Sequence, residues 1–239
     1  MSSMWPVDAE GLVAVQHELA GAEPEPWRPE EPAETGTLVG GCWVCFPRGI
    51  SGPGSAGDPV WAAAVVLSGG RTVDHTVVRG EAGAPYTPGL LALRMGAVME
   101  EAVRRLGTRP DVLFLDASGR DHPRGAGLAV HLGAVLDLPT VGVTHRPLLA
   151  EGEWPADRRG DTSPLRLGDE TVGCWMRTQP RARPLAVHPG WRVDLPTAVS
   201  LVEAATRRHR TPEPLRRARR LAREARAAAQ GQRPSTRSR

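Results

Sequence analysis

One short apolar run is followed closely by residue types that support acid–base and phosphate chemistry. The run Asp111–Asp116 (DVLFLD) ends in a carboxylate, and Asp121, His122 and Arg124 come soon after it. Carboxylate oxygens are preferred ligands of Mg²⁺, histidine transfers protons near neutral pH, and arginine binds phosphate through paired hydrogen bonds. This pattern makes Asp116 and His122 candidate catalytic residues, with Asp116 as a candidate metal ligand and Arg124 as a candidate phosphate contact.

Each of these residues also has a structural interpretation. Asp116 can be a strand-end carboxylate that accepts hydrogen bonds from nearby backbone N–H groups, and we prefer this interpretation. Asp121 and His122 could together form a substitute metal site, although a role in orienting the loop explains His122 better. Arg124 could form an ion pair with Asp121 or Asp116 instead of binding phosphate.

A second candidate site is a loop in which prolines flank an aromatic residue. Pro85, Tyr86, Thr87 and Pro88 precede Gly89, and the prolines restrict the backbone on both sides of the ring. Tyr86 is the single tyrosine of the chain. A ring held in an exposed, stiff loop can stack on a nucleic-acid base, whereas the alternative is that it packs the loop. We favour the stacking role.

Basic charge is concentrated near the end of the chain. Residues 207–239 contain 12 arginines against two glutamates, a net charge of +10, whereas residues 1–206 contain 18 arginines against 25 acids, a net charge of −7. An arginine-rich tail beside an acidic body predicts an anionic partner, DNA or RNA first, and a solvated helix is the alternative. No membrane partner is expected, because the apolar residues of the tail are mostly alanine.

The composition is typical of an ordinary globular protein. With 239 residues, 40% hydrophobic and 24% charged, the chain can form one large domain or two small ones. It contains no apolar run long enough for a transmembrane helix, and its first residues lack the pattern of a secretory signal. Three cysteines are too few for a disulfide framework, which predicts a reducing, cytoplasmic location.

The elements that must position these residues predict an α/β fold. Three β-prone segments come first and are expected to be antiparallel, with a hairpin turn at Ser68–Arg71: 37–46, 60–67 and 72–78. Helices and strands then alternate, which predicts a parallel half of the sheet: helices 90–106 and 125–136, strands 111–116 and 140–143. The remaining segments are expected as helices 7–21, 196–208 and 214–229, a loop at 146–169, and a strand pair at 172–176 and 185–188.

These elements suggest a chain in three parts. Residues 1–36 form an acidic, proline-rich N-terminal segment, residues 37–206 the central α/β domain, and residues 207–239 an arginine-rich helical or disordered tail. The helix expected at 214–229 is polar on most faces, so we expect it to project from the body.

Several motifs, in order, resemble the endonuclease V family. Pro85–Gly89 is similar to its Pro-Tyr-x-Pro-Gly wedge, and Asp111–Asp116 followed by His122–Arg124 is similar to its aspartate strand and His-Pro-Arg element. Asp137–Val143 resembles the next turn and strand, and the strand that ends in Phe46 resembles the first strand of that family. The order and spacing of these motifs make the resemblance specific at the level of the fold.

The resemblance extends over roughly residues 37–203 and implies an RNase H-like nuclease fold with a mixed sheet flanked by helices. It also implies hydrolysis of phosphodiester bonds near deaminated bases, chiefly inosine, in DNA or RNA, with Mg²⁺ as the cofactor. In that family Asp116 would be a metal ligand and Pro85–Pro88 the wedge. Arg124 would contact phosphate, and His145 and Arg146 could replace the lysine of that family as nucleic-acid contacts. An ordinary polar surface position is an equally good interpretation of His145.

The chain departs from the family at the positions that should hold the metal. Trp43 and Met95 stand where the resemblance implies an aspartate and a glutamate, and Trp191 and His145 stand where it implies a histidine and a lysine. An indole cannot ligate Mg²⁺ and a thioether is a soft, weak acceptor, so Asp116 alone is retained of three carboxylates. We therefore expect a dismantled magnesium site in which Trp43 and Met95 pack together or line a new apolar pocket for a base.

Three functions are consistent with this sequence. The first is a nucleic-acid-binding pseudoenzyme that binds damaged or inosine-containing strands with weak or no cleavage. The second is an active magnesium-dependent repair nuclease with a site rebuilt around Asp116, Asp121 and His122, or with a replacement carboxylate from Asp58 or Asp74. The third is a protein-interaction module that no longer binds nucleic acid.

Overall fold

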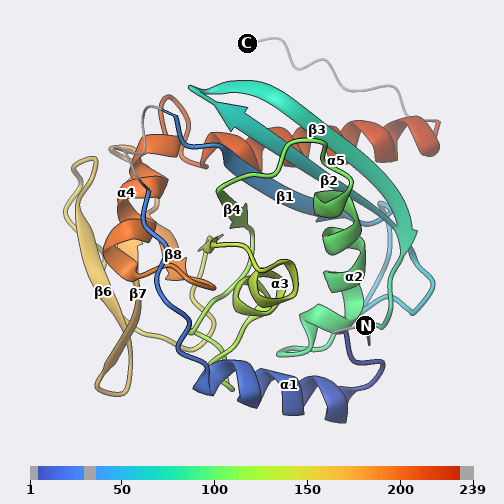
Figure 1. Cartoon of the computed structure of the whole chain (residues 1–239), viewed down its shortest axis with the longest axis horizontal. Helices are drawn as coiled ribbons and strands as arrows, with labels where there is room; N and C mark the ends of the chain where they lie inside the picture. The colour runs from blue at the N-terminus through green and yellow to red at the C-terminus, as the bar shows by residue number, and fades with distance from the viewer. Residues whose placement is uncertain (1–4, 30–35, 232–239) are drawn as a thin grey trace.

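The computed structural model describes residues 5–29 and 36–231 and contains one mixed sheet of eight strands (Figure 1). The strands lie in the order β3-β2-β1-β4-β5-β8-β7-β6. Their bounds are β1 Val39–Cys45, β2 Pro59–Ser68, β3 Arg71–Glu81, β4 Val112–Leu115, β5 Thr140–Thr144, β6 Thr162–Leu167, β7 Glu170–Met176 and β8 Leu185–Pro189. Strands β1, β4 and β5 are parallel neighbours and the other pairs are antiparallel. The expected mixed α/β fold is confirmed.

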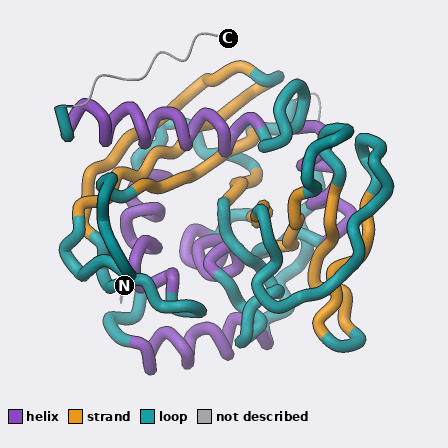
Figure 2. Tube along the Cα trace, turned by 180° about the vertical axis from the view of Figure 1, so that it is seen from behind, coloured by secondary structure: helices purple, strands orange, loops and turns teal. Residues whose placement is uncertain are grey.

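The described residues contain five helices, four on the faces of this sheet and one packed on other helices (Figure 2). They are α1 Ala9–Gly21, α2 Leu91–Arg104, α3 Leu128–Leu136, α4 Leu195–Ala205 and α5 Glu213–Ala229. Successive residues of a strand point to opposite faces. Leu113 of β4 accordingly packs in the cluster of α2 and α3, whereas Phe114 packs in the cluster of α4 and the start of α5.

The hairpin predicted at Ser68–Arg71 joins β2 to β3. Gly69 and Gly70 have φ angles of 55° and 81°, which a tight hairpin turn requires and glycine adopts without steric cost. Strand β2 is buried along nearly its whole length because α2 covers one face and α5 the other. Its run of alanine and valine suits a strand that helices approach from both sides.

Two elements differ from the expectation. The segment expected as a loop at 146–169 contains β6, the last strand of the sheet, which pairs with β7 and carries Pro164. A proline inside a strand is tolerated at a sheet edge, where its missing N–H is not needed by a second neighbour. Helix α5 does not project from the body, because Leu215, Ala218 and Ala222 are buried and pack it across β1 and β2.

Helix α1, within the expected N-terminal segment, also belongs to the packed body. Helix α1 begins after Asp8, whose side chain accepts a hydrogen bond from the Gly11 N–H and caps the helix. Leu19 packs with Ala126 and Val130 at α3. In the described residues, no helix is long and apolar enough to cross a membrane.

Candidate functional site

Asp116 and Trp43 meet at the end of the β1–β4 pair. Cys42 lies opposite Leu115 in the parallel register, so Trp43 and Asp116 are the next residues of the two strands. Trp43 Nε1 donates a hydrogen bond to Asp116 Oδ2 over 3.1 Å. Asp116 is exposed and Trp43 is half-buried. The strand-end carboxylate therefore has an indole N–H donor as its neighbour on β1.

The residues around Asp116 do not fit a magnesium ion. Mg²⁺ needs several hard oxygen ligands, and within residues 5–29 and 36–231 no group of three or more His, Cys, Asp or Glu side chains is placed to hold a metal. The two acids considered as replacements are engaged elsewhere. Asp58 binds the Arg94 guanidinium at 3.0 Å, and Asp74 accepts from the Thr108 N–H at 2.8 Å. The donor set at this point is therefore a single carboxylate.

Asp121 holds the loop that follows β5. Its side chain is fully buried, and its carboxylate oxygens accept hydrogen bonds from the N–H groups of Leu148, Leu149 and Ala150 at 2.5, 2.8 and 2.6 Å. A buried carboxylate must be satisfied in this way, because an unpaired one is very costly. The interpretation in which Asp121 rebuilds a metal site is not supported by this geometry.

His122 and Arg124 anchor the proline-flanked loop through one carbonyl. The Gly89 oxygen accepts from Arg124 Nη2 at 2.6 Å and from Gln16 Nε2 at 3.2 Å, and His122 Nε2 lies 3.1 Å from it. Burial, followed by the charge of Arg124, lowers the pKa of His122. The neutral ring can then donate from Nε2 to Gly89 while Nδ1 accepts from the Arg124 N–H. Arg124 forms neither of the ion pairs considered for it.

The loop that carries Tyr86 is also held by a buried arginine, which was not among the residues predicted for the site. Arg94 of α2 pairs with Asp58 and donates to the Ala84 oxygen at 2.6 Å. The Tyr86 N–H donates to the Pro53 oxygen at 2.8 Å. These contacts leave the Tyr86 ring 50% exposed at the tip of a fixed loop. The sequence did contain a sign of this role, because Arg94 is a charged residue among the apolar positions of the helix predicted at 90–106.

A cavity of about 290 Å³ lies between this loop and the end of the sheet. Its lining includes Tyr86, Asp116, His122 and Arg146, together with the apolar side chain of Leu128. A flat polar ring suits such a lining, since one aromatic side chain can stack on it and polar groups can contact its edge. The structure thus brings four of the predicted site residues to one cavity.

His145 lies on the other side of Asp116. It lines a small cavity of about 20 Å³ together with Trp43, Asp116 and Arg219. Partial burial and, secondly, the charge of Arg210 lower the pKa of His145. Leu215 and Arg219 of α5 also line this second cavity, so Asp116 contributes to two cavities, one at the tyrosine loop and a small one beside α5.

Two of the substituted positions lie apart from the Trp43–Asp116 pair. Met95 packs with Leu115 between the sheet and α2, whereas Trp43 packs with Leu221 of α5. The expectation that Trp43 and Met95 pack together is wrong, because the side chain of Trp43 points to the α5 face of β1. Trp191 packs near α1 and α3.

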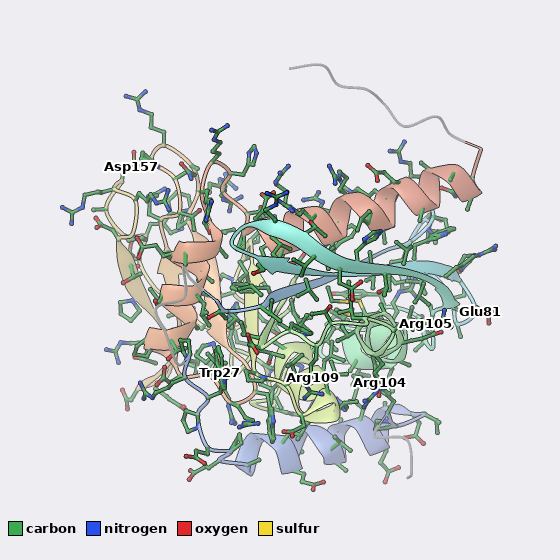
Figure 3. The ribbon with its side chains drawn as sticks, turned by 45° about the horizontal axis from the view of Figure 1, so that its top comes forward. Trp27, Glu81, Arg104, Arg105, Arg109 and Asp157 are labelled. Atoms are coloured by element: carbon green, nitrogen blue, oxygen red, sulfur yellow. The ribbon has the colours of Figure 1, made fainter. Side chains whose placement is uncertain are left out.

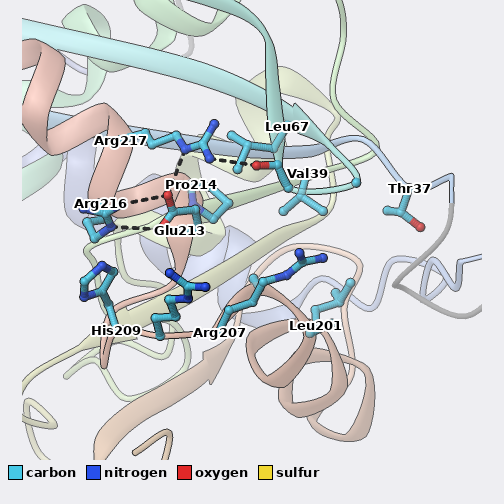
Figure 4. Close-up of a pocket in the computed structure, with 15 residues that line it drawn as sticks. Thr37, Val39, Leu67, Leu201, Arg207, His209, Glu213, Pro214, Arg216 and Arg217 are labelled. Carbon is cyan, nitrogen blue, oxygen red and sulfur yellow. Dashed lines mark hydrogen bonds and ion pairs between the residues drawn. The ribbon is translucent and has the colours of Figure 1, made fainter.

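Another cavity, about 320 Å³, lies between the start of β1, the end of β2, the end of α4 and the start of α5 (Figure 4). Its single acid, Glu213, is paired with Arg216 and Arg217 at 2.8 and 2.9 Å, and these contacts hold the pKa of Glu213 at about 2. This cavity contains none of the predicted site residues.

Comparison with known proteins relates this chain to a described family. The family model for endonuclease V matches residues 28–220. The endonuclease V of Streptomyces avermitilis is 39% identical over 227 residues, which cover 92% of this chain and 93% of the relative. That of Methanopyrus kandleri is 43% identical over 178 residues, which cover 74% of this chain and 77% of the relative.

Solved structures give the same result. The crystal structure of S. avermitilis endonuclease V superposes with a TM-score of 0.84 at 39% identity, covering 95% of this chain and 96% of that chain. The catalytic domain of human endonuclease V gives 0.81 at 32% identity, covering 94% and 99%. At 22% identity, and thus informative for the fold, Ciona intestinalis endonuclease V in complex with a 24mer DNA containing an inosine gives 0.74, covering 90% and 96%.

Proposed function

The chain belongs to the endonuclease V family, and from this premise we propose that it is a nucleic-acid-binding member with a dismantled metal site and weak or no cleavage. Its partner is DNA or RNA with single-stranded, damaged or deaminated sites, inosine first among them. Three buried free cysteines are consistent with a reducing location such as the cytoplasm.

The observation that carries the loss of cleavage is the Trp43–Asp116 hydrogen bond. The indole N–H occupies Asp116 Oδ2 at 3.1 Å and stands where a second carboxylate would be needed. Metal-assisted hydrolysis of a phosphodiester needs an ion that activates water and stabilises the leaving oxygen. A lone carboxylate, hydrogen-bonded to an indole, is a poor ligand set for such an ion.

Retained binding is supported by the loop and cavity beside Asp116. Tyr86 is exposed on a loop that Arg94 and Arg124 hold in place, and a cavity large enough for a flat base opens next to it. The Ciona relative is a DNA-binding protein of the same fold. We infer that a displaced base enters this cavity with Tyr86 at its side.

A combined binding and cleavage assay tests this proposal. The full chain and Asp116→Ala are incubated with inosine-containing and unmodified DNA and RNA, with Mg²⁺ and separately with Mn²⁺. We expect preferential binding of the inosine-containing strands and product formation no greater than that of Asp116→Ala.

Two results would overturn parts of it. Cleavage by the native chain that disappears in Asp116→Ala would show a working nuclease. An absence of binding to every oligonucleotide would favour the protein-interaction module instead.

A further inference from the structure

Two arginines of α5 lie over the indole that neighbours Asp116. The guanidinium carbons of Arg219 and Arg223 are 5.5 and 5.4 Å from the centre of the Trp43 ring. Both distances are within the range of a cation–π contact. Arg219 also lines the small cavity with Asp116, so positive charge is held directly beside the strand-end carboxylate.

These arginines belong to a larger group without acidic partners. Arg226 continues the row and donates from Nη1 to the Phe46 oxygen at 3.1 Å. Burial and then the charges of Arg219, Arg226 and Arg48 lower the pKa of Arg223. In the part of the chain that the structure describes, none of these four arginines forms an ion pair with an acid, and the Nε atoms of Arg219 and Arg226 are buried without a hydrogen-bond partner.

Some other arginines of the described residues are paired with a nearby acid, unlike the members of this group. On α5 itself Arg220 lies near Glu224 at 3.7 Å. Figure 3 labels Arg104 and Arg105 at the end of α2. Each pairs with a glutamate one turn earlier in the helix at 2.6 Å. Like charges held together without counter-charge destabilise a fold, so a cluster of this kind is stabilised when an anion binds.

We propose that Arg219 and Arg223, stacked on Trp43 and backed by Arg226 and Arg48, form a phosphate-binding site that operates without a divalent ion. The inference rests on the proposed function and adds to it the chemical group that is bound, a phosphodiester of the strand. Guanidinium groups match phosphate oxygens through paired hydrogen bonds, and the indole face fixes their orientation.

Asp116 limits where the phosphate binds. Its carboxylate repels a phosphate, but its Oδ2 already accepts from Trp43 Nε1. The four guanidinium groups outnumber this one negative charge. The phosphate is therefore expected on the solvent side of the Arg219–Arg223 pair, along the row that leads away from Asp116 towards Arg48.

Oligonucleotide binding by single-charge variants tests the site. Fluorescence anisotropy with a labelled inosine-containing single strand is measured in EDTA and in Mg²⁺ for the full chain, Arg219→Gln and Arg223→Gln. Arg220→Gln is the matched control, because it removes the same charge from the same helix but from a position paired with Glu224. EDTA should leave the affinity of the native chain unchanged.

We expect Arg219→Gln and Arg223→Gln each to lower affinity roughly tenfold and to reduce the slope of log K against log salt by about one. Arg220→Gln should change affinity less than about twofold. Melting temperatures identify any variant that fails to fold, and Arg223, an exposed residue, keeps the test available if Arg219→Gln does not fold. Equal affinity of all three variants, or loss of binding in EDTA, overturns the proposal.

A titration with inorganic phosphate in EDTA separates this inference from the proposed function. The indole N–H resonance of Trp43, assigned with Trp43→Phe, should shift and saturate with phosphate but not with chloride at equal ionic strength. A saturating shift without oligonucleotide binding would leave the phosphate site standing and reject the proposed function. Oligonucleotide binding without any phosphate-induced shift would support the proposed function and reject the phosphate site.

Discussion

The indole of Trp43 donates its one hydrogen bond to Asp116, across the parallel pair of β1 and β4. This contact occupies one carboxylate oxygen of the candidate metal ligand and places an apolar ring beside it. The same ring supports Arg219 and Arg223 from α5. One side chain thus donates to the exposed carboxylate of Asp116 and stacks against two cations.

Restoring an acid on β1 should partly restore metal binding. Trp43→Asp puts a second carboxylate next to Asp116 at the end of the strand pair, so Mg²⁺ affinity measured by titration calorimetry should rise at least about tenfold. Trp43→Phe removes the indole without adding an oxygen ligand and should show no gain. If Trp43→Asp binds no better than Trp43→Phe, the two strand ends do not converge on a metal.

Removing the Tyr86 ring should weaken nucleic-acid binding without affecting stability. The ring is half exposed, and base–aromatic stacking contributes about 1–3 kcal/mol, so Tyr86→Ala should lower affinity by roughly 5- to 150-fold. Tyr86→Phe keeps the ring and should bind like the native chain. Native affinity of Tyr86→Ala in an anisotropy titration would mean that the ring only packs the loop.

A substitution at Gly89 should loosen the Tyr86 loop without removing the tyrosine ring. Gly89 has φ of +76°, and an added Cβ would lie 3.0 Å from Arg124 Nη2. Gly89→Ala should therefore reduce the free energy of unfolding by about 1–2 kcal/mol and also weaken binding. Gly168→Ala is a useful control, since its φ of +60° brings similar strain at a remote turn with no atom within 4 Å. If both variants bind nucleic acid equally well, the position of the Tyr86 loop does not contribute to recognition.

Acid should destabilise the protein through His188. This side chain is fully buried, its Nε2 lies 3.0 Å from Thr144 Oγ1, and burial lowers its pKa to about 4 despite the charge of Asp121. The unfolded chain then binds more protons between pH 6.5 and 4, so the free energy of unfolding falls by up to about 3 kcal/mol as pH decreases through that window.

Denaturant unfolding at several pH values measures this dependence. His188→Gln should flatten the curve between pH 4 and 6.5, whereas His17→Gln, at an exposed position on α1, should leave it unchanged. If the free energy of unfolding of His188→Gln depends on pH as in the native chain, other groups cause the acid sensitivity.

Local signals predicted the sheet well where they were strong. The Gly69–Gly70 turn, the apolar run before Asp116 and the alternation of helices and strands gave β2–β3 and β4–β5. Strand β6 was missed because Pro164 and the polar residues of an edge strand look like a loop. The burial of α5 was missed because its arginines dominate the composition while alanines make the contact.

The site was less predictable because its contacts join distant segments. The sequence suggests Asp121 as a possible metal ligand, but in the structure its carboxylate accepts three hydrogen bonds from N–H groups of the loop after β5. The carbonyl of Gly89 receives donors from α1 and from the segment before α3. Side-chain partners separated by tens of residues leave no periodic signal in the sequence.

Helix α1 helps to hold the loop that carries Tyr86. Gln16 reaches the Gly89 carbonyl and the Arg124 guanidinium, and Arg120 fastens the end of α1 through the Ala20 and Ala22 oxygens. The region matched by the family model starts at residue 28, after this helix. Loss of α1 would therefore leave the strands of the sheet in place but remove the Gln16 contacts that hold the tyrosine loop.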